Sequence, residues 1–191
     1  MNERIKIVSV ETLAKNWGTL TRATIDYQRA DGSWQRLARE NYDHGNAAAM
    51  LLHNPARDTV LLVRQFRYPP TRNGDPGFML ETCAGLIDDG ESAAAAIARE
   101  ALEETGHAPR HVRHVCDTYL SPGSVQEKVS LFIGEYDETT LSGEGGGLAA
   151  EGEEIELVEL PLSEALAMIA DGRIVDGKTI ILLQHLAMMR G

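Results

Sequence analysis

An alanine-rich segment between Gly90 and Gly106 constrains the fold more than any other part of this sequence. Ser92 is a preferred residue for capping the N-terminus of a helix, and alanine has the highest helix propensity. Gly106 can end the helix in the left-handed conformation, and Pro109 beyond it cannot continue a helix. The pattern therefore predicts a helix over residues 93–104.

Three glutamates, Glu100, Glu103 and Glu104, share one face of this predicted helix, because residues three and four positions apart are neighbours. Like charges at this spacing destabilise a helix by roughly 0.2–0.5 kcal/mol per pair, so a compensating partner is expected. Magnesium prefers oxygen ligands and commonly bridges a carboxylate to a substrate phosphate. The alternative is a solvated acidic face, since charge runs are usually exposed surface. The other side carries an apolar stripe suited to packing on a sheet: Ala94, Ile97, Ala98, Ala101 and Leu102.

The rest of the chain alternates apolar runs with turn residues. Residues 19–27 and 33–42 predict an antiparallel ribbon, which is marginal alone and must dock on the rest of the chain or on a second subunit. Residues 47–52 and 59–66 predict a second hairpin, and the glycine-rich segment 142–152 predicts a mobile loop. Further elements are expected as a short apolar stretch at 78–83, strands at 112–119, 128–136 and 154–160, and helices at 162–170 and 177–189.

Composition excludes several classes of protein. A length of 191 residues favours one main domain with room for a small subdomain. The net charge of −11, with 18 basic against 29 acidic residues, argues against a nucleic-acid partner. The sequence contains no apolar run long enough for a membrane span, and its start lacks the apolar stretch of a signal peptide. Two cysteines, Cys83 and Cys116, predict reduced thiols and a cytoplasmic location.

Residues 85–107 resemble the Nudix box, G-x5-E-x7-R-E-U-x-E-E-x-G-U. The resemblance implies a hydrolase of a nucleoside diphosphate linked to another group. It also implies the Nudix fold, of class α/β (α+β), in which helices sandwich a mixed sheet. His107 stands where the family usually has an aliphatic residue, a position expected to serve packing rather than chemistry. The matching positions are Gly85, Glu91, Arg99, Glu100, Glu103, Glu104 and Gly106.

The same resemblance implies roles for the acidic residues. Glu100 and Glu104 are expected to be the principal ligands of Mg²⁺, for which Mn²⁺ is a possible substitute. Glu103 is expected to be a further ligand or a water-mediated contact, and the backbone carbonyl of Ala84 to complete the set. Glu104 is also expected to take part in catalysis.

Two further positions complete the expected machinery. Glu91 and Arg99 are expected to form a supporting ion pair that holds the loop before the helix. Glu151 and Glu153, on the glycine-rich loop, are the candidates for a last carboxylate that binds metal or activates water. Glu153 is favoured over Glu151, and both stay open.

Several stretches resemble the GDP-mannose pyrophosphatase subgroup of the family, namely residues 39–46, 63–67, 83–86, 121–125 and 176–179. This resemblance implies hydrolysis of GDP-mannose to GMP and mannose 1-phosphate. It also implies a homodimer in which an N-terminal β subdomain, residues 1–45, is swapped onto the Nudix domain, residues 46–191, of the partner. The substrate-binding residues expected from it are Trp17, Arg39 and Glu40 from the partner chain, together with Arg67, Gly85, Leu86, Glu127 and Lys178.

Three alternatives stay open at this point. The first is hydrolysis of ADP-ribose to AMP and ribose 5-phosphate by the same machinery. It stays open because residues 121–123 resemble the proline-marked loop of Nudix enzymes that act on ADP-ribose. The second is a non-catalytic nucleotide-sensing module on a Nudix scaffold. The third is a zinc site formed by His107, His111 and His114 on a helix, which Pro109 disfavours.

Overall fold

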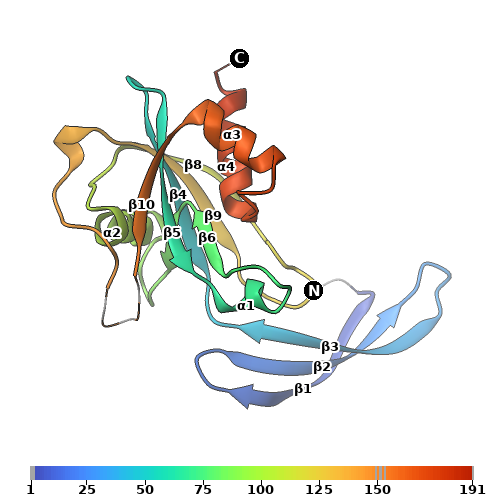
Figure 1. Ribbon diagram of the computed structural model, residues 1–191. Coiled ribbons are helices and arrows are strands. Elements are labelled where there is room, and N and C mark those ends of the chain that lie inside the picture. The colour runs from blue at the N-terminus through green and yellow to red at the C-terminus, as the bar shows by residue number, and fades with distance from the viewer. Residues whose placement is uncertain (1–2, 149, 151, 153, 191) are drawn as a thin grey trace. The chain divides into compact units, whose positions relative to one another are not determined.

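The computed structural model describes residues 3–148, 150, 152 and 154–190, which form two compact units that are treated separately (Figure 1). The first unit is drawn from Met1–Asn46 and Tyr119–Lys128, and the second from Ala47–Thr118 and Val129–Gly191. In the first unit, Tyr42 pairs with the Tyr119–Lys128 segment, because its backbone N–H donates to the Ser124 carbonyl at 2.8 Å. No helix in the part of the chain that is described is long and apolar enough to cross a membrane.

The first unit is a three-stranded antiparallel sheet of β1 (Ile5–Lys15), β2 (Thr19–Gln28) and β3 (Trp34–Asp43), in that order. The prediction of a two-stranded ribbon was incomplete, since β1 was missed. Its pairing with β2 slips between Ile7 and Ser9 and again between Thr12 and Ala14. Such bulges break the period-two pattern by which a strand is predicted.

The second unit is built on a mixed seven-stranded sheet with the path β10-β5-β4-β9-β8, on which β6 pairs with β5 and β7 pairs with β4. The β4 and β9 strands are parallel, and the other pairs are antiparallel. The strands are β4 (Ala47–Asn54), β5 (Thr59–Phe66), β6 (Phe78–Glu81), β7 (Cys83–Leu86), β8 (Arg110–Thr118), β9 (Val129–Glu135) and β10 (Glu156–Pro161).

Helices cover both faces of this sheet, as the resemblance implied (Figure 1). Every residue of β4 is buried, because successive side chains of a strand point to opposite faces and each face has a core. Met50 packs in the core that includes Ile97 of α2 (Ala93–Thr105). Leu51 packs in the other core, with residues of α3 (Leu162–Ala170) and α4 (Gly177–Met188).

Two predictions about the region before α2 were too simple. The apolar stretch at 78–83 is two strands, β6 and β7, which separate at Thr82. The buried Thr82 donates its N–H to Thr179 Oγ1 at 2.7 Å and its hydroxyl to the Met50 carbonyl, and so ties the break to α4 and β4. The predicted hairpin of β4 and β5 pairs directly only near its turn, because β6 and β7 occupy the remaining pairing edges. A short helix, α1 (Tyr68–Thr71), follows β5 and was not predicted.

Candidate active site

The α2 helix forms and ends as its sequence predicts. The Ser92 hydroxyl accepts a hydrogen bond from the Ala95 N–H at 3.2 Å, which caps the N-terminus. Gly106 adopts the left-handed conformation with φ of 74°, and its N–H donates to the Leu102 carbonyl at 2.9 Å. Burial of Ala96, Ile97 and Ala101 against the sheet fixes the rotation of the helix, whereas Ala94, Ala98 and Leu102 of the predicted apolar stripe are exposed. That rotation turns Glu100 and Glu104 toward β7.

Glu100 and Glu104 lie against the β7 backbone. Glu104 is only 1% exposed, and its Oε2 accepts a hydrogen bond from the Ala84 N–H at 3.3 Å. A Cβ atom at Gly85 would lie 2.0 Å from the carboxyl carbon of Glu100, so only glycine leaves room for this carboxylate. The structure therefore brings together Ala84, Gly85 and the two glutamates.

Arg99 makes hydrogen bonds to acidic residues of α2 and of the loop before it. Its guanidinium donates to Glu100 at 2.8 Å and to Glu91 and Glu103 at 3.2 Å each. A fourth bond, to the Leu86 carbonyl at 3.3 Å, links the helix to the end of β7. The hydrogen bond with Glu91, supported by Glu100, raises the pKa of Arg99, and the same hydrogen bond lowers the pKa of Glu91.

The carboxylates of α2 do not form one cluster. Glu100 and Glu104 lie at β7, and Arg99 bonds Glu103, one helical turn along, as well as Glu100. Within residues 3–148, 150, 152 and 154–190, no three His, Cys, Asp or Glu side chains are grouped so that they could hold one metal ion. The remaining candidates, Glu151 and Glu153, lie outside the described residues.

The glycine-rich loop is attached to the end of α2 over its described part. The Gly146 N–H donates to the Glu104 carbonyl at 2.8 Å, and the Gly147 N–H donates to the Glu103 carbonyl at 3.1 Å. A Cβ atom at Gly106 would lie 2.6 Å from the Gly143 carbonyl oxygen, so the close approach requires glycine. Hydrogen bonds therefore anchor the described part of the loop to the end of the helix that carries the glutamates.

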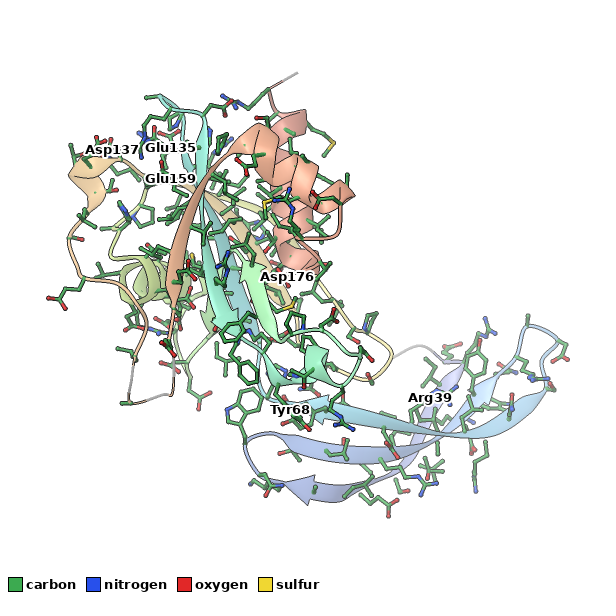
Figure 2. The ribbon with its side chains drawn as sticks, in the orientation of Figure 1. Arg39, Tyr68, Glu135, Asp137, Glu159 and Asp176 are labelled. Carbon is green, nitrogen blue, oxygen red and sulfur yellow. The ribbon has the colours of Figure 1, made fainter. Side chains whose placement is uncertain are left out.

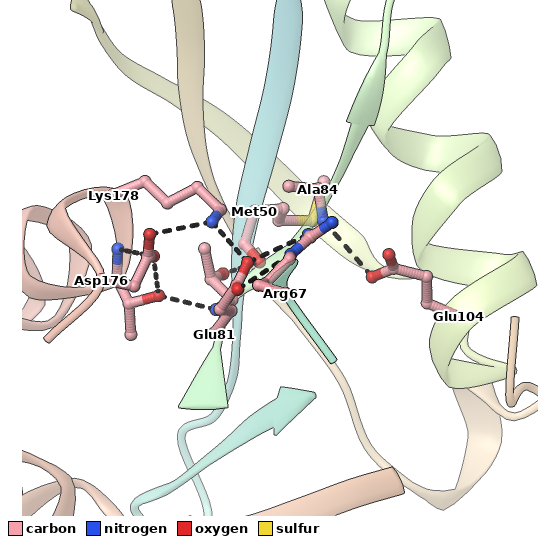
Figure 3. A network of polar contacts seen from close by, with 9 residues as sticks. Met50, Arg67, Glu81, Ala84, Glu104, Asp176 and Lys178 are labelled. Carbon is pink, nitrogen blue, oxygen red and sulfur yellow. Dashed lines mark hydrogen bonds and ion pairs between the residues drawn. The ribbon is translucent and has the colours of Figure 1, made fainter. Parts of the chain in front are cut away.

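A second polar network lies before β7 and was not predicted from the sequence (Figure 3). Its centre is Glu81, the last residue of β6, which is 2% exposed. Arg67 donates from Nε and Nη2 to the two carboxylate oxygens of Glu81 at 3.0 and 3.1 Å. Lys178 donates to Glu81 at 2.6 Å and to Asp176 at 3.0 Å. A glutamate within the apolar run 78–83 was the signal that could have pointed to this buried charge.

The network shifts the pKa values of its members. Burial opposes the charge of Glu81, but Lys178 and Arg67 outweigh burial and lower its pKa from the ordinary 4.5. Burial likewise opposes the charge of Lys178, but Glu81 and Asp176 outweigh it and raise its pKa above 10.5. Both groups are therefore ionised at neutral pH.

These shifts predict a pH-dependent contribution to stability. A carboxylate with a lowered pKa stabilises the fold above its unfolded-state pKa, and this stability is lost as the pH falls through the folded-state pKa. The contribution of Lys178, whose pKa is raised, is lost instead at high pH. We expect Glu81→Gln to reduce the free energy of unfolding at pH 7 and to do so much less at about pH 3. Urea unfolding at both pH values measures the difference, and an equal loss at both would contradict it.

The other predicted substrate-binding residues lie in the first unit, namely Trp17, Arg39, Glu40 and Glu127. Trp17 is 72% exposed and stacks on His44, with ring centroids 4.9 Å apart and an interplanar angle of 20°. His44 Nδ1 lies 4.0 Å from Glu127 Oε1, so Trp17 and Glu127 contact the same imidazole. Arg39 and Glu40 are exposed neighbours on β3, and because successive residues of a strand alternate, their side chains point to opposite faces of the sheet.

The histidines do not form a helical zinc site. His107 donates or accepts a hydrogen bond with Thr140 Oγ1 at 2.8 Å and meets the Tyr136 ring edge-on at 5.2 Å. It therefore serves packing, as expected for the last position of the box. His111 and His114 lie on the β8 strand.

Comparisons with known proteins relate this chain to characterised families. Residues 4–42 match a family model described as the GDP-mannose pyrophosphatase NudK N-terminal domain, and residues 43–183 match the NUDIX domain. A GDP-mannose pyrophosphatase of Pectobacterium atrosepticum is 48% identical, covering 100% of this chain and 97% of its own length. One of Klebsiella pneumoniae is 46% identical, covering 97% and 93%. A crystal structure of an ADP compounds hydrolase superposes with a TM-score of 0.74 over 98% of this chain and 94% of its own, at 21% identity, and supports the fold alone.

Proposed function

Because this chain belongs to the Nudix family, we propose that it hydrolyses the pyrophosphate bond of a nucleoside diphosphate sugar, and that GDP-mannose is its substrate. The products would be GMP and mannose 1-phosphate. The observation that carries this choice is the identity of 48% and 46% to two proteins named GDP-mannose pyrophosphatase over nearly the whole chain. The similarity includes residues 4–42, whose family model is described as the N-terminal domain of a GDP-mannose pyrophosphatase.

Nudix enzymes generally use divalent metal ions, and we propose Mg²⁺ here, with Mn²⁺ as a possible substitute. Glu100, Glu104 and the Ala84 carbonyl are hard oxygen donors of the kind that Mg²⁺ prefers, and Gly85 leaves the space that Glu100 needs. The ion would neutralise the diphosphate and make water a better nucleophile. Glu103 would contribute directly or through water, although it pairs with Arg99.

The last carboxylate is assigned to the glycine-rich loop. We propose Glu153, with Glu151 as the alternative, as the group that binds metal or takes a proton from water together with Glu104. Support comes from the hydrogen bonds of Gly146 and Gly147 to the end of α2, since these bonds hold the described part of the loop at the helix that bears the glutamates.

Arg99 holds these carboxylates in place, which leads to a prediction. We expect Arg99→Lys to raise the Mg²⁺ concentration for half-maximal turnover by roughly 10- to 100-fold, because lysine cannot replace a fork that bonds Glu91, Glu100 and Leu86 together. A Mg²⁺ titration of turnover measures this. Arg64→Lys, which alters an exposed pair with Glu156 on the same sheet, is the matched control and should leave the titration unchanged. An unaltered Mg²⁺ requirement in Arg99→Lys would count against the role.

Substrate contacts are proposed from both units. Arg67 and Lys178 suit the phosphates, because guanidinium and ammonium groups donate to phosphate oxygens, and Gly85 and Leu86 offer backbone at the end of β7. Glu127 would face the metal-bound diphosphate and the sugar phosphate. For the guanine we propose Trp17, Arg39 and Glu40 of the partner chain: Trp17 has an exposed ring face, and the Glu40 carboxylate can accept from the paired donors of the base.

We propose that the chain is a homodimer in which the N-terminal β subdomain, residues 1–45, is exchanged between subunits. Ile7, Val8 and Val10 of β1 are 51%, 50% and 60% exposed, and such apolar strands are normally covered. In the second unit, Phe66 and Phe78 are also more than half exposed. Light scattering after gel filtration should give twice the mass of the 20.9 kDa chain, and a monomer at micromolar concentration would contradict the proposal.

We also propose a cytoplasmic location. Cys83 and Cys116 are both free thiols, and Cys83 is buried on β7. Reduced, unpaired cysteines are usual in the cytoplasm.

The substrate assignment is tested by comparing GDP-mannose, ADP-ribose, ADP-glucose and UDP-glucose under the same conditions. We expect GDP-mannose to have the highest kcat/KM, with release of GMP. Preference for ADP-ribose, with release of AMP and ribose 5-phosphate, would select the alternative substrate on the same scaffold. No turnover of any member of the panel with Mg²⁺ or Mn²⁺ would instead support a nucleotide-sensing module.

A further inference from the structure

Glu81 joins two elements that are far apart in the sequence. Its carboxylate accepts hydrogen bonds from Arg67, which follows β5, and from Lys178, in the first turn of α4. It is also close in sequence to the β7 residues at which Glu100 and Glu104 lie, with Thr82 bonded to Thr179 between them. The two cations that are proposed to bind phosphate therefore depend on the same buried anion.

The geometry of the Arg67 pair leaves part of its guanidinium directed elsewhere. Both bonds to Glu81 come from the Nε and Nη2 edge, so the Nη1 side of the group faces away from Glu81. Arg67 is also close enough to Glu104 for their charges to interact. An arginine held by one edge of its planar fork can present its other edge in a fixed direction.

We propose that Glu81 is a positioning residue for phosphate binding, which aligns Arg67 and Lys178 toward the diphosphate without touching the substrate itself. This inference rests on the proposed hydrolysis of a nucleoside diphosphate sugar. Arg67 and Lys178 are long side chains with several rotamers, and fixing them before substrate arrives reduces the entropy lost on binding.

A competing role for Glu81 makes the opposite prediction. If the carboxylate only neutralised two partly buried cations, its removal would leave more positive charge for the phosphates, and substrate would bind more tightly. If it positions them, its removal lets both side chains leave their binding directions, and substrate binds more weakly. The two roles therefore differ in the sign of the change in KM.

The test is the steady-state kinetics of Glu81→Gln with GDP-mannose, or with whichever member of the panel wild type turns over fastest. We expect KM to rise roughly 10- to 100-fold, the range of one or two charge-assisted hydrogen bonds, with a smaller change in kcat. The Mg²⁺ concentration for half-maximal turnover should stay at the wild-type value, which separates this role from damage to the metal site.

The matched control is Glu159→Gln. Glu159 is also a strand glutamate bonded to an arginine, Arg57 at 2.6 Å, and to Tyr136 at 2.9 Å, but it lies away from Asp176 (Figure 2). It should keep the wild-type KM. In an Arg67→Ala, Lys178→Met background, Glu81→Gln should add less than about threefold, because a residue that acts through two others has no effect without them.

The outcomes separate this inference from the function on which it rests. A wild-type protein that hydrolyses no member of the panel overturns both. An active wild type with a KM in Glu81→Gln that is unchanged or lower overturns the positioning role alone. If the Arg67→Ala, Lys178→Met background does not fold, the comparison of KM between Glu81→Gln and Glu159→Gln still tests the positioning role.

Discussion

Replacing Glu104 with glutamine is expected to reduce turnover of GDP-mannose by roughly 1000-fold or more, the largest loss expected from any single substitution in this chain. The variant keeps the size of a side chain that is 1% exposed but removes the charge that would hold the cation. The Ala84 N–H can still donate to the glutamine oxygen, so the fold should persist. Release of GMP at saturating substrate and Mg²⁺ measures the loss.

Two variants of the same helix make the result specific. Glu100→Gln should behave like Glu104→Gln, because both carboxylates lie at β7. Glu103→Gln should lose less, about 10-fold, because Glu103 is proposed only as a further ligand or a contact through water. Circular dichroism melting should show folded protein in each. Full activity in both Glu100→Gln and Glu104→Gln would end the assignment of metal ligands.

The second large effect is expected from Gly85→Ala, which adds a single methyl group. That carbon would lie 2.0 Å from the carboxyl group of Glu100, so the carboxylate must move away. The displaced atoms are the end of a flexible side chain, so the loss of stability should be small. We expect turnover to fall at least 100-fold while the melting temperature changes by only a few degrees, because a misplaced ligand costs catalysis rather than folding.

A double variant isolates the cause of this effect. Glu100→Ala removes the atoms that the new methyl group meets, so adding Gly85→Ala to it should change neither stability nor residual activity further. If Gly85→Ala alone keeps full turnover, the crowding between β7 and Glu100 has no importance for the chemistry.

The central helix and its neighbours could be predicted from the sequence because their signals are local. Ser92 and Gly106 mark the two ends of α2, and the helix extends just one residue beyond the predicted range. The α3 helix occupies the predicted residues 162–170. The ion pair of Glu91 and Arg99 was expected from the resemblance to the Nudix box, and the two groups lie 3.2 Å apart.

What could not be predicted depends on contacts between distant residues. The network of Glu81 joins positions 97 residues apart in the chain, and no local pattern encodes such a contact. The β1 strand was not predicted because its two bulges interrupt the alternating pattern, and its pairing with β2 is evident only in the structure. His44 was missed beneath Trp17 because stacking between a hairpin residue and the end of β3 has no periodic signature.

The most direct test of the account is the release of GMP and mannose 1-phosphate from GDP-mannose, followed first without metal and then during a titration with Mg²⁺. We expect no product from the metal-free protein and saturable turnover as Mg²⁺ is added, with Glu104→Gln inactive throughout. Equal turnover with and without the divalent ion, or none at any concentration of it, would contradict the claim that the α2 glutamates hold the metal for this hydrolysis.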